Sequence, residues 1–315
     1  MWDTPASGED LLKLLTNNSF QAGPNLERFL PTIRGGPVPD LTIAVAMYNS
    51  ETTVEDLLAS IYGQSSQRVE VVIVDDASTD ASLEIANSTP RYGTRVTVVS
   101  HKEQGGLGQA RESALSCASG KYIHFVDSDD LLLPGAVDAI LRLVTKKNFD
   151  IVFLGVVETK RGKDRPLHSP FQLQSLASAD AGWNIASRPE LLFLPASTWS
   201  KVFRRAFLLE QKIEFPSGYH QDLPSSTEAL LRAERIGGVD YPCYRYIRRS
   251  EGSSATRSKG TKTLVRVDQI RRIRERTDIY SLPRNVQKHL VALVAIHLIW
   301  GNRAAYRTLP EDLHE

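Results

Sequence analysis

The sequence predicts an α/β domain built on a mostly parallel central sheet flanked by helices. Three observations lead to this fold class. Apolar runs of strand length alternate with longer helical patterns from residue 41 onward. Several of these runs are apolar at nearly every position, which is typical of strands that helices cover on both faces. Acidic and other polar residues directly follow the runs, where ligands bind in sheets of this kind.

The expected elements follow one another at regular spacing. Strands are predicted at the apolar runs 41–47, 69–74, 96–99, 122–126 and 151–157. Helices are predicted over 54–62, 78–87, 109–119, 134–146 and 225–233. A short helix over 8–16 and a loop rich in Gly and Pro precede the first strand. We therefore expect an N-terminal extension over 1–40 and a regular domain that begins at residue 41.

The composition limits the class of protein. The chain has 315 residues, of which 41% are hydrophobic, and this is enough for one large or two smaller domains. A net charge of +1 gives no overall field for binding nucleic acid. The two cysteines lie far apart, and neither a signal peptide nor an apolar stretch of roughly 20 residues is visible. These observations predict a reduced, cytoplasmic protein.

A group of carboxylates follows the predicted strand 122–126. Asp127, Asp129 and Asp130 stand within four positions of one another. Packing acids together at a strand end is unfavourable unless a cation neutralises them. A divalent metal that also holds a diphosphate would do so, because such ions bind carboxylate and phosphate oxygens. The alternative is a solvated acidic turn that begins a helix.

A dinucleotide-binding site of the Rossmann type does not fit this chain. That site needs a Gly-rich turn after the first strand, whereas Tyr48-Asn49-Ser50-Glu51 stands there. The sequence also has no phosphate-binding P-loop and no Gly-x-Ser-x-Gly motif.

Four motifs in order resemble the family 2 inverting glycosyltransferases, which have the GT-A fold. They are AVAMYN at 44–49, VDDASTD at 74–80, GQAR at 108–111 and DSDD at 127–130. Together they cover about 90 residues, and a looser similarity extends to residue 257. The resemblance implies a catalytic domain over 41–257, with a nucleotide-binding half at 41–143 and an acceptor half at 144–257. Residues 258–315 would form a basic and apolar helical C-terminal segment.

The resemblance also implies which residues bind the donor. Tyr48 would lie against the nucleotide base, Asp76 would accept a base N–H, and Arg111 would reach into the nucleotide site. Asp129 and Asp130, with Asp127 as a further candidate, would hold Mn²⁺ or Mg²⁺. The full set implied for the nucleotide sugar is Ala46, Tyr48, Glu51, Asp76, Gln104, Arg111, Asp127, Ser128, Arg248 and Arg249. Gln104 departs from the Asn found in many relatives.

The acceptor half carries the implied catalytic base. Relatives typically have Glu-Asp where this chain has Gln221-Asp222, so Asp222 would be the general base of an inverting displacement. The alternative is that Asp222 is only a loop or capping residue before a helix. Trp199, Lys201, His220 and Gln221 would lie on the acceptor side.

Basic residues gather in the last part of the chain. Residues 245–276 hold nine Arg and two Lys against three acids. The run 244–254 resembles the family's flexible segment after the last core strand, whose Arg and Ser would cover the diphosphate. A solvated basic face is the alternative. The apolar stretch 286–300 would pack on the domain, and residues 261–300 could dock on a membrane surface or a second copy.

The resemblance therefore predicts a metal-dependent hexosyl- or N-acetylhexosaminyl-transferase that uses a UDP-sugar. Its acceptor would be a polyol or polysaccharide of the cell wall, such as a teichoic-acid-like polymer, and it could attach peripherally to the inner face of the membrane. Two other hypotheses stay open. One is a nucleotidyl- or phosphotransferase on the same kind of sheet. The other is a degenerate domain that binds or scaffolds a polymer.

Overall fold

The computed structural model describes residues 38–64, 66–167, 170–178, 181–249 and 265–306. The predicted helix over 8–16 and nearly all of the N-terminal extension lie outside the described residues. The second half of the basic run 244–254 lies outside them as well.

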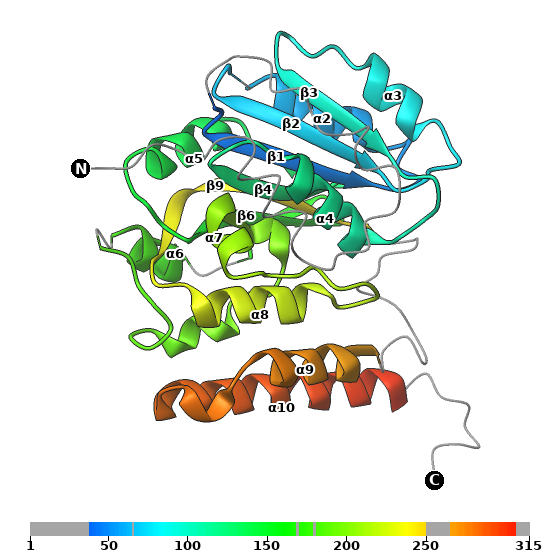
Figure 1. Cartoon of the computed structure of the whole chain (residues 1–315). Helices are drawn as coiled ribbons and strands as arrows, with labels where there is room; N and C mark the ends of the chain where they lie inside the picture. The colour runs from blue at the N-terminus through cyan, green and yellow to red at the C-terminus, as the bar shows by residue number, and fades with distance from the viewer. Residues whose placement is uncertain (1–37, 65, 168–169, 179–180, 250–264, 307–315) are drawn as a thin grey trace, which may run out of the picture. The chain divides into compact units, whose positions relative to one another are not determined.

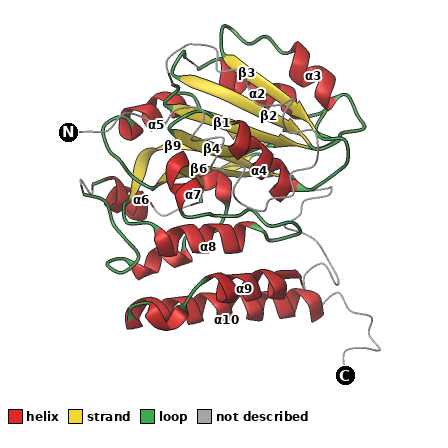
Figure 2. Ribbon diagram, viewed as in Figure 1, coloured by secondary structure: helices red, strands yellow, loops and turns green. Residues whose placement is uncertain are grey.

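A mixed sheet forms the centre of the described chain (Figures 1 and 2). The strand order is β3-β2-β1-β4-β8-β6-β9-β5, and β7 pairs with β6 at the side. The strands are β1 (Leu41–Met47), β2 (Val69–Asp75), β3 (Arg95–Ser100), β4 (Tyr122–Asp127), β5 (Leu131–Leu132), β6 (Ile151–Lys160), β7 (Lys163–Pro166), β8 (Lys201–Arg204) and β9 (Ile236–Arg248). All five predicted strands are present.

The parallel part of the sheet is its first four strands. β1 pairs in parallel with both β2 and β4, and β2 pairs in parallel with β3. Beyond β4 the direction changes, because β8 runs antiparallel to both β4 and β6. The predicted α/β class is confirmed, with a sheet that is mixed beyond its parallel half.

The helices cover the sheet on both faces (Figure 2). They are α2 (Val54–Tyr62), α3 (Ser82–Ser88), α4 (Leu107–Cys117), α5 (Ala136–Val144), α6 (Pro170–Ala177), α7 (Arg205–Glu210), α8 (Asp222–Arg232), α9 (Val265–Arg276) and α10 (Arg284–Tyr306). Three short 3₁₀ helices are η2 (Pro189–Phe193), η3 (Thr198–Ser200) and η6 (Ile279–Ser281).

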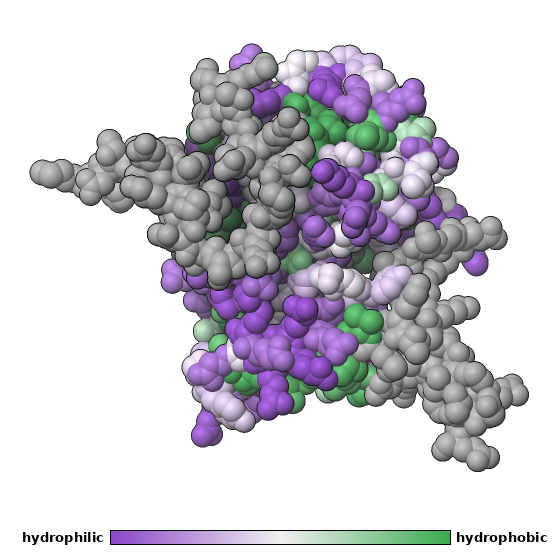
Figure 3. All heavy atoms as spheres, turned by 45° about the vertical axis from the view of Figure 1, so that its right-hand side comes forward, coloured by the Kyte–Doolittle hydropathy of each residue, from purple (hydrophilic) through white to green (hydrophobic). Residues whose placement is uncertain are grey.

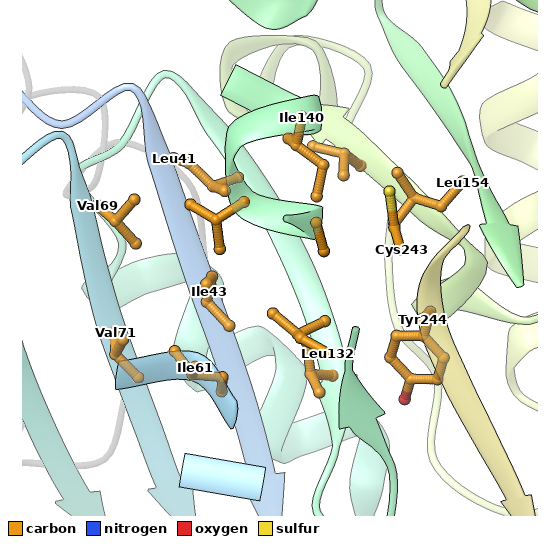
Figure 4. Packing of buried hydrophobic residues seen from close by; sticks show 14 of the residues in the cluster. Leu41, Ile43, Ile61, Val69, Val71, Leu132, Ile140, Leu154, Cys243 and Tyr244 are labelled. Carbon is orange, nitrogen blue, oxygen red and sulfur yellow. The ribbon is translucent and has the colours of Figure 1, made fainter. Parts of the chain in front are cut away.

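Alternation along the strands divides the core into two clusters. Leu41 and Ile43 of β1 point to the cluster shared with α2 and α5, which Figure 4 shows from close by. Ala44 points to the opposite cluster, shared with α4, α7 and α8. Because both faces are covered, the inner strands are apolar at most positions, and their polar residues Thr42, Glu70 and His124 are buried as well.

Four helices begin at positions that differ from the prediction. α3 begins later, at Ser82, and α8 begins earlier, at Asp222. α4 begins two residues earlier, at Leu107, directly after Gly106, whose φ of 84° places it in the left-handed region. α5 begins at Ala136 after Gly135, with a φ of 79°. At α4 and α5 a glycine turns the chain, so the turn and not the apolar pattern decides where the helix begins.

The C-terminal helices pack on the same core as the sheet. Ile273 of α9 and Val286, Leu290 and Leu293 of α10 are buried members of the cluster that contains α8. Arg276 of α9 binds the buried Glu228 of α8 through Nε, at 3.0 and 2.9 Å from the two carboxylate oxygens. In Figure 1 the pair α9–α10 lies beside α8.

Part of the α9–α10 surface is apolar. Figure 3 shows hydrophobic residues between hydrophilic ones at the lower end of the molecule, where these helices lie. The exposed large residues there include Val267, Val291, Ile296 and Ile299. No helix in the described part of the chain is long and apolar enough to span a bilayer. Docking of this segment on a membrane surface or on a second copy stays a prediction.

Candidate active site

The polar residues of the sequence motifs meet at one edge of the sheet. In the parallel register Met47 of β1 lies opposite Asp75 of β2, and Ala46 lies opposite Asp127 of β4. Tyr48, Asp76 and the acids after β4 therefore leave the sheet at the same end. This is the carboxyl edge, where the alternation of strands and helices predicts a ligand.

Three carboxylates at this edge lie close enough to hold one metal ion. Oxygens of Asp127, Asp129 and Asp130 all lie within 4.8 Å of one another. Burial and the neighbouring acids raise the pKa of Asp130 to about 8. Burial raises the pKa of Asp127 to about 6, and Asp222 and Asp129 add to the shift while Arg111 opposes it. The cluster is thus short of positive charge, as a cation site would be.

The three acids differ in how the protein holds them. Asp130 is buried, and its two oxygens accept from the Tyr244 hydroxyl at 2.7 Å and from the backbone N of Ile247 at 2.8 Å. Asp129 is exposed and pairs with Arg249 at 2.6 Å. Asp130 is therefore fixed by β9, whereas Asp129 is the most accessible of the three.

Arg111 of α4 joins this cluster to the second half of the site. Its side chain is only 1% exposed, and Nη2 lies 3.0 Å from Oδ1 of Asp127. Nη1 binds Oδ1 of Asp222, the first residue of α8. Burial lowers the pKa of the Arg111 guanidinium, but the charges of Asp222 and Asp127 outweigh burial and raise it. A fully ionised buried arginine therefore connects the two carboxylates.

Asp222 keeps one oxygen for a further contact. The Thr198 hydroxyl donates to Oδ1 at 2.6 Å, and Arg111 binds the same oxygen. Among the described residues both contacts end on Oδ1, and the side chain is 27% exposed. Asp222 is thus held in place by one oxygen while Oδ2 can meet a hydroxyl group.

The loop that begins α4 is held by Asp76. Its Oδ1 accepts from the backbone N of Gly105 at 2.9 Å, and its Oδ2 accepts from Gly106 at 2.7 Å. His101 Nδ1 lies 2.8 Å from Oδ1. In this state both oxygens of Asp76 already have partners, and recognition of a base by Asp76 stays a prediction. Asp75 braces the neighbouring loop by accepting from the backbone N of Ser78.

The other predicted donor residues lie at the same edge. Tyr48 is 41% exposed, which excludes a role as a core aromatic. Glu51 accepts from the backbone N of Ala81 at 3.1 Å. Ser128 shares a hydrogen bond of 2.7 Å with Ser50. Ala46 is partly buried near the end of β1, and Gln104 is exposed just before the Gly105–Gly106 turn.

The basic run near residue 248 is more ordered than predicted. Tyr244 to Arg248 belong to β9 and pair with Val156 to Lys160 of β6, so this part is not a flexible segment after the last strand. The pairing with β6 and β5 extends the strand past the end of its apolar stretch. Arg248 binds the buried Glu158 at 3.2 Å, and Arg249 follows the strand directly.

Two residues predicted on the acceptor side are buried instead. Trp199 is 6% exposed and stacks on Tyr244 with ring centroids 4.9 Å apart. Lys201 is fully buried, and Nζ donates to the carbonyls of Pro195 at 2.7 Å and Ser197 at 2.9 Å. The physical reason is that the chain enters the sheet between β4 and β6 here, which covers Trp199 and Lys201.

His220 and Gln221 do lie beside Asp222. Gln221 is buried, and its Oε1 has no hydrogen-bond partner among the described residues. His220 has a φ of 60° and faces Arg266 of α9. Burial, with Arg266 and His297 nearby, lowers the pKa of His220 to about 4.

Sequence reasoning missed two supporting residues. Tyr244 holds Asp130, and Thr198 holds Asp222. Tyr244 stands in an alternating stretch of β9 with Tyr246, so a strand assignment would have placed both rings on one face. No local signal marks Thr198, because its contact depends on residue 222 in another element.

The chain is similar to known proteins over most of this fold. The family model "Glycosyl transferase family 2" matches residues 42–205, which is more than half of the chain. A poly(ribitol-phosphate) beta-glucosyltransferase of Bacillus spizizenii is 31% identical over 217 residues, covering 66% of this chain and 32% of that protein. The uncharacterized glycosyltransferase EpsJ of Bacillus subtilis is 28% identical, covering 66% of this chain and 61% of EpsJ.

Solved structures agree in fold. TarS 1–349 of S. aureus has a TM-score of 0.68 at 24% identity, covering 88% of this chain and 76% of that one. TarS 1–349 in complex with UDP has a TM-score of 0.67 at 23% identity, covering 87% and 76%. A mannosyltransferase of Pyrobaculum calidifontis in complex with GDP-Man and Mn²⁺ has a TM-score of 0.55 at 17% identity, covering 85% and 76%.

Proposed function

The chain belongs to glycosyltransferase family 2, and from this we propose that it transfers a sugar from a UDP-sugar to a hydroxyl acceptor with inversion. The alternative of a nucleotidyl- or phosphotransferase has no comparable support. Alignment with the curated relatives EpsJ and EpsH spans only about 60% of their lengths, so substrate and acceptor are part of the proposal.

One observation carries the proposal: Arg111 binds Asp127 and Asp222 at the same time. Asp127 belongs to the acidic cluster of the donor half, and Asp222 belongs to the acceptor half. An inverting transfer needs a base on the side of the sugar opposite the leaving diphosphate. A base supplied by a separate element, and linked to the donor cluster through one side chain, suits that requirement.

The acidic cluster fits a divalent metal. Mn²⁺ and Mg²⁺ prefer oxygen ligands, and three carboxylate oxygens within 4.8 Å provide them. We propose Asp129 as a direct ligand because it is accessible, with Asp127 beside it, and Asp130 as the residue that fixes the turn through Tyr244. When bound, the ion would neutralise charge on the donor diphosphate. The Mn²⁺ complex of the similar mannosyltransferase and the chemistry of the cluster support this choice.

Side chains of the protein carry out the remaining steps of the proposed reaction. Asp222 takes the proton of the acceptor hydroxyl at Oδ2, while Arg111 and Thr198 hold its side chain in position through Oδ1. Arg249, next to Asp129, is placed to stabilise the negative charge that develops on the departing diphosphate. Tyr48 at the sheet edge offers its exposed ring to the base.

The proposed acceptor is a cell-surface polymer rich in hydroxyl groups. The support comes from similarity to a poly(ribitol-phosphate) beta-glucosyltransferase. Hexosyl and N-acetylhexosaminyl donors are both consistent with this proposal. The predicted cytoplasmic location and attachment to a membrane surface stay predictions.

A donor screen tests the proposed function. Purified protein with Mn²⁺ is incubated with individual UDP-sugars and GDP-mannose, and release of the nucleoside diphosphate is followed. We expect slow release from at least one UDP-sugar, its loss in EDTA and its return with added Mn²⁺. Full turnover in chelator would contradict the metal assignment, and turnover of GDP-mannose alone would contradict the choice of UDP.

A further inference from the structure

Three basic side chains from separate elements converge beside Asp222. Arg266 lies at the start of α9, His220 precedes α8 by two residues, and His297 lies on α10. Nη2 of Arg266 is 3.4 Å from Nε2 of His220 and 3.5 Å from its Nδ1. His297 is close enough to interact electrostatically with both. A guanidinium only donates hydrogen bonds, so His220 must be neutral to accept one here.

The protein holds this group of three in place. Buried Gln269, one turn after Arg266 on α9, donates from Nε2 to the carbonyl of Ser217 at 3.1 Å and of Tyr219 at 3.3 Å. The loop that carries His220 is therefore fastened to the helix that carries Arg266. The packing of this loop against α9 therefore brings Arg266 and His220 together.

An anion is missing from this arrangement in the described chain. No described carboxylate forms an ion pair with Arg266, and its buried Nε has no hydrogen-bond partner there. The acid that acts on His220 is Asp222, which Arg111 and Thr198 already hold. A half-buried guanidinium without an anion is unfavourable, since desolvation costs energy that only a counter-charge offsets.

We infer that Arg266, His220 and His297 form a binding site for a phosphate group of the acceptor, next to the catalytic base. A tetrahedral oxyanion can accept hydrogen bonds from a guanidinium and two imidazoles that approach from three elements. This inference rests on the proposed function, because it assigns the site to the acceptor of that reaction. It narrows the acceptor from any hydroxyl polymer to one that carries phosphate near the reacting hydroxyl.

The placement favours the acceptor over the donor. The donor acids lie after β4 and interact with Arg111 and Arg249, whereas Arg266 contacts none of them. His297 also lines a cavity of about 330 Å³ beside α8, most of whose other lining side chains are apolar.

The test measures phosphate binding directly, without turnover. The full chain is titrated with inorganic phosphate and with glycerol 3-phosphate while the imidazole NMR signals are recorded. His220→Asn and His297→Asn assign the two signals among the seven histidines. We expect saturable shifts of both signals, and in Arg266→Gln a half-saturation concentration at least about tenfold higher, since a charge-assisted bond is lost.

Two further variants make the result specific. Arg271→Gln removes an exposed arginine of the same helix that pairs with Asp268, so binding should not change. Arg266→Lys keeps the charge and should retain part of the phosphate binding. Retained binding in this variant would show that the weak binding of Arg266→Gln comes from the lost charge and not from misfolding. Equal shifts in wild type and Arg266→Gln would overturn the inference.

Two competitors separate the sources of phosphate. If UDP with Mg²⁺ displaces inorganic phosphate from these histidines, the site belongs to the donor and the inference is wrong. If phosphatidylglycerol vesicles shift the signals and soluble phosphates do not, it binds lipid headgroups and the inference is also wrong. Calorimetry with UDP is run in parallel: absence of UDP binding contradicts the proposed function, whereas UDP binding without phosphate-dependent shifts contradicts this inference alone.

Discussion

Asp222 and Asp127 share one guanidinium, so a change at either carboxylate alters the charge that the other experiences. Arg111 is buried, and it would be left partly unpaired if either acid lost its charge. Substitutions that keep shape are therefore the most informative at this scale, because they remove a charge without opening a cavity.

Asp222→Asn is expected to separate binding from chemistry. Asn keeps an oxygen for Arg111 and Thr198 but cannot take a proton, so kcat should fall by roughly 10²–10⁴ while affinity for UDP stays near wild type. Calorimetry and a transfer assay measure the two quantities. Asp240→Asn, an exposed substitution on β9, serves as the control. Lost UDP binding with normal turnover of bound donor would place Asp222 in the nucleotide site.

Metal affinity should depend on pH through the acidic cluster. The pKa of Asp127 is raised to about 6 and that of Asp130 to about 8, mainly by burial. A protonated Asp127 is a poor ligand, and a protonated Asp130 no longer adds negative charge beside the ion. Protons therefore compete with the metal more strongly as pH falls. We expect Mn²⁺ affinity to rise steadily across the range in which these two groups titrate, with proton release on binding, measured by calorimetry in buffers of different ionisation enthalpy. Constant affinity over this range would contradict the assignment of the metal to these acids.

The sequence is sufficient to place the acids but not to pair them. Asp127, Asp129 and Asp222 can be found because strand ends and motif spacing mark them. The bond from Arg111 to Asp222 spans 111 positions, and whether an arginine extends to the nucleotide or to a carboxylate depends on its buried surroundings. Burial of Lys201 cannot be foreseen either, because the short strand β8 has no long apolar run.

At the scale of elements, β9 connects the basic run to the acidic cluster. Its backbone N at Ile247 and its Tyr244 hydroxyl hold Asp130, and Arg249 at its end binds Asp129. The family resemblance predicts a flexible segment over 244–254, after the last core strand. Hydrogen bonding to β6 instead keeps residues 244–248 in the strand.

Arg249→Glu is expected to weaken donor use. It places a negative charge beside Asp129, so donor KM should rise and kcat should fall, each by about tenfold or more. Arg245→Glu is the matched control, because Arg245 lies 3.4 Å from exposed Asp164 of β7 and contacts none of the three acids. Hydrolysis of the donor without acceptor is measured for both variants. Equal rates in wild type and Arg249→Glu would rule out a role for Arg249 at the diphosphate.

At the scale of the whole molecule, the described C-terminal helices complete the core of the sheet. The described residues from 38 onward belong to one compact unit, and four aliphatic side chains of α9 and α10 are buried in it. The domain boundary predicted at residue 257 follows from the point where family similarity fades. Similarity reports shared ancestry and active-site motifs, whereas the core depends on which apolar faces pack together.

A chain that ends at residue 249 is therefore expected to be unstable. It exposes the surface that Ile273, Val286, Leu290 and Leu293 cover, and each such side chain contributes about 1.5–3 kcal/mol when buried. Thermal unfolding and solubility of residues 1–249 and 1–315 are compared. A shortened chain that unfolds at the temperature of the full chain would show that α9 and α10 are not needed for the core.

The aromatic stack at the centre of the molecule gives it a built-in optical reporter. Trp199 lies 4.9 Å from the ring of Tyr244 and 5.1 Å from that of Tyr246, and the Tyr244 hydroxyl binds Asp130. Indole emission responds to nearby charge and to the orientation of neighbouring dipoles. A cation bound at the carboxylates changes both the charge and the dipoles near Trp199, because Tyr244 contacts Asp130 on one side and the indole on the other. Occupancy of the site can therefore be followed by fluorescence of the native chain. Trp199→Phe keeps the other three tryptophans and so identifies the part of the signal that comes from Trp199.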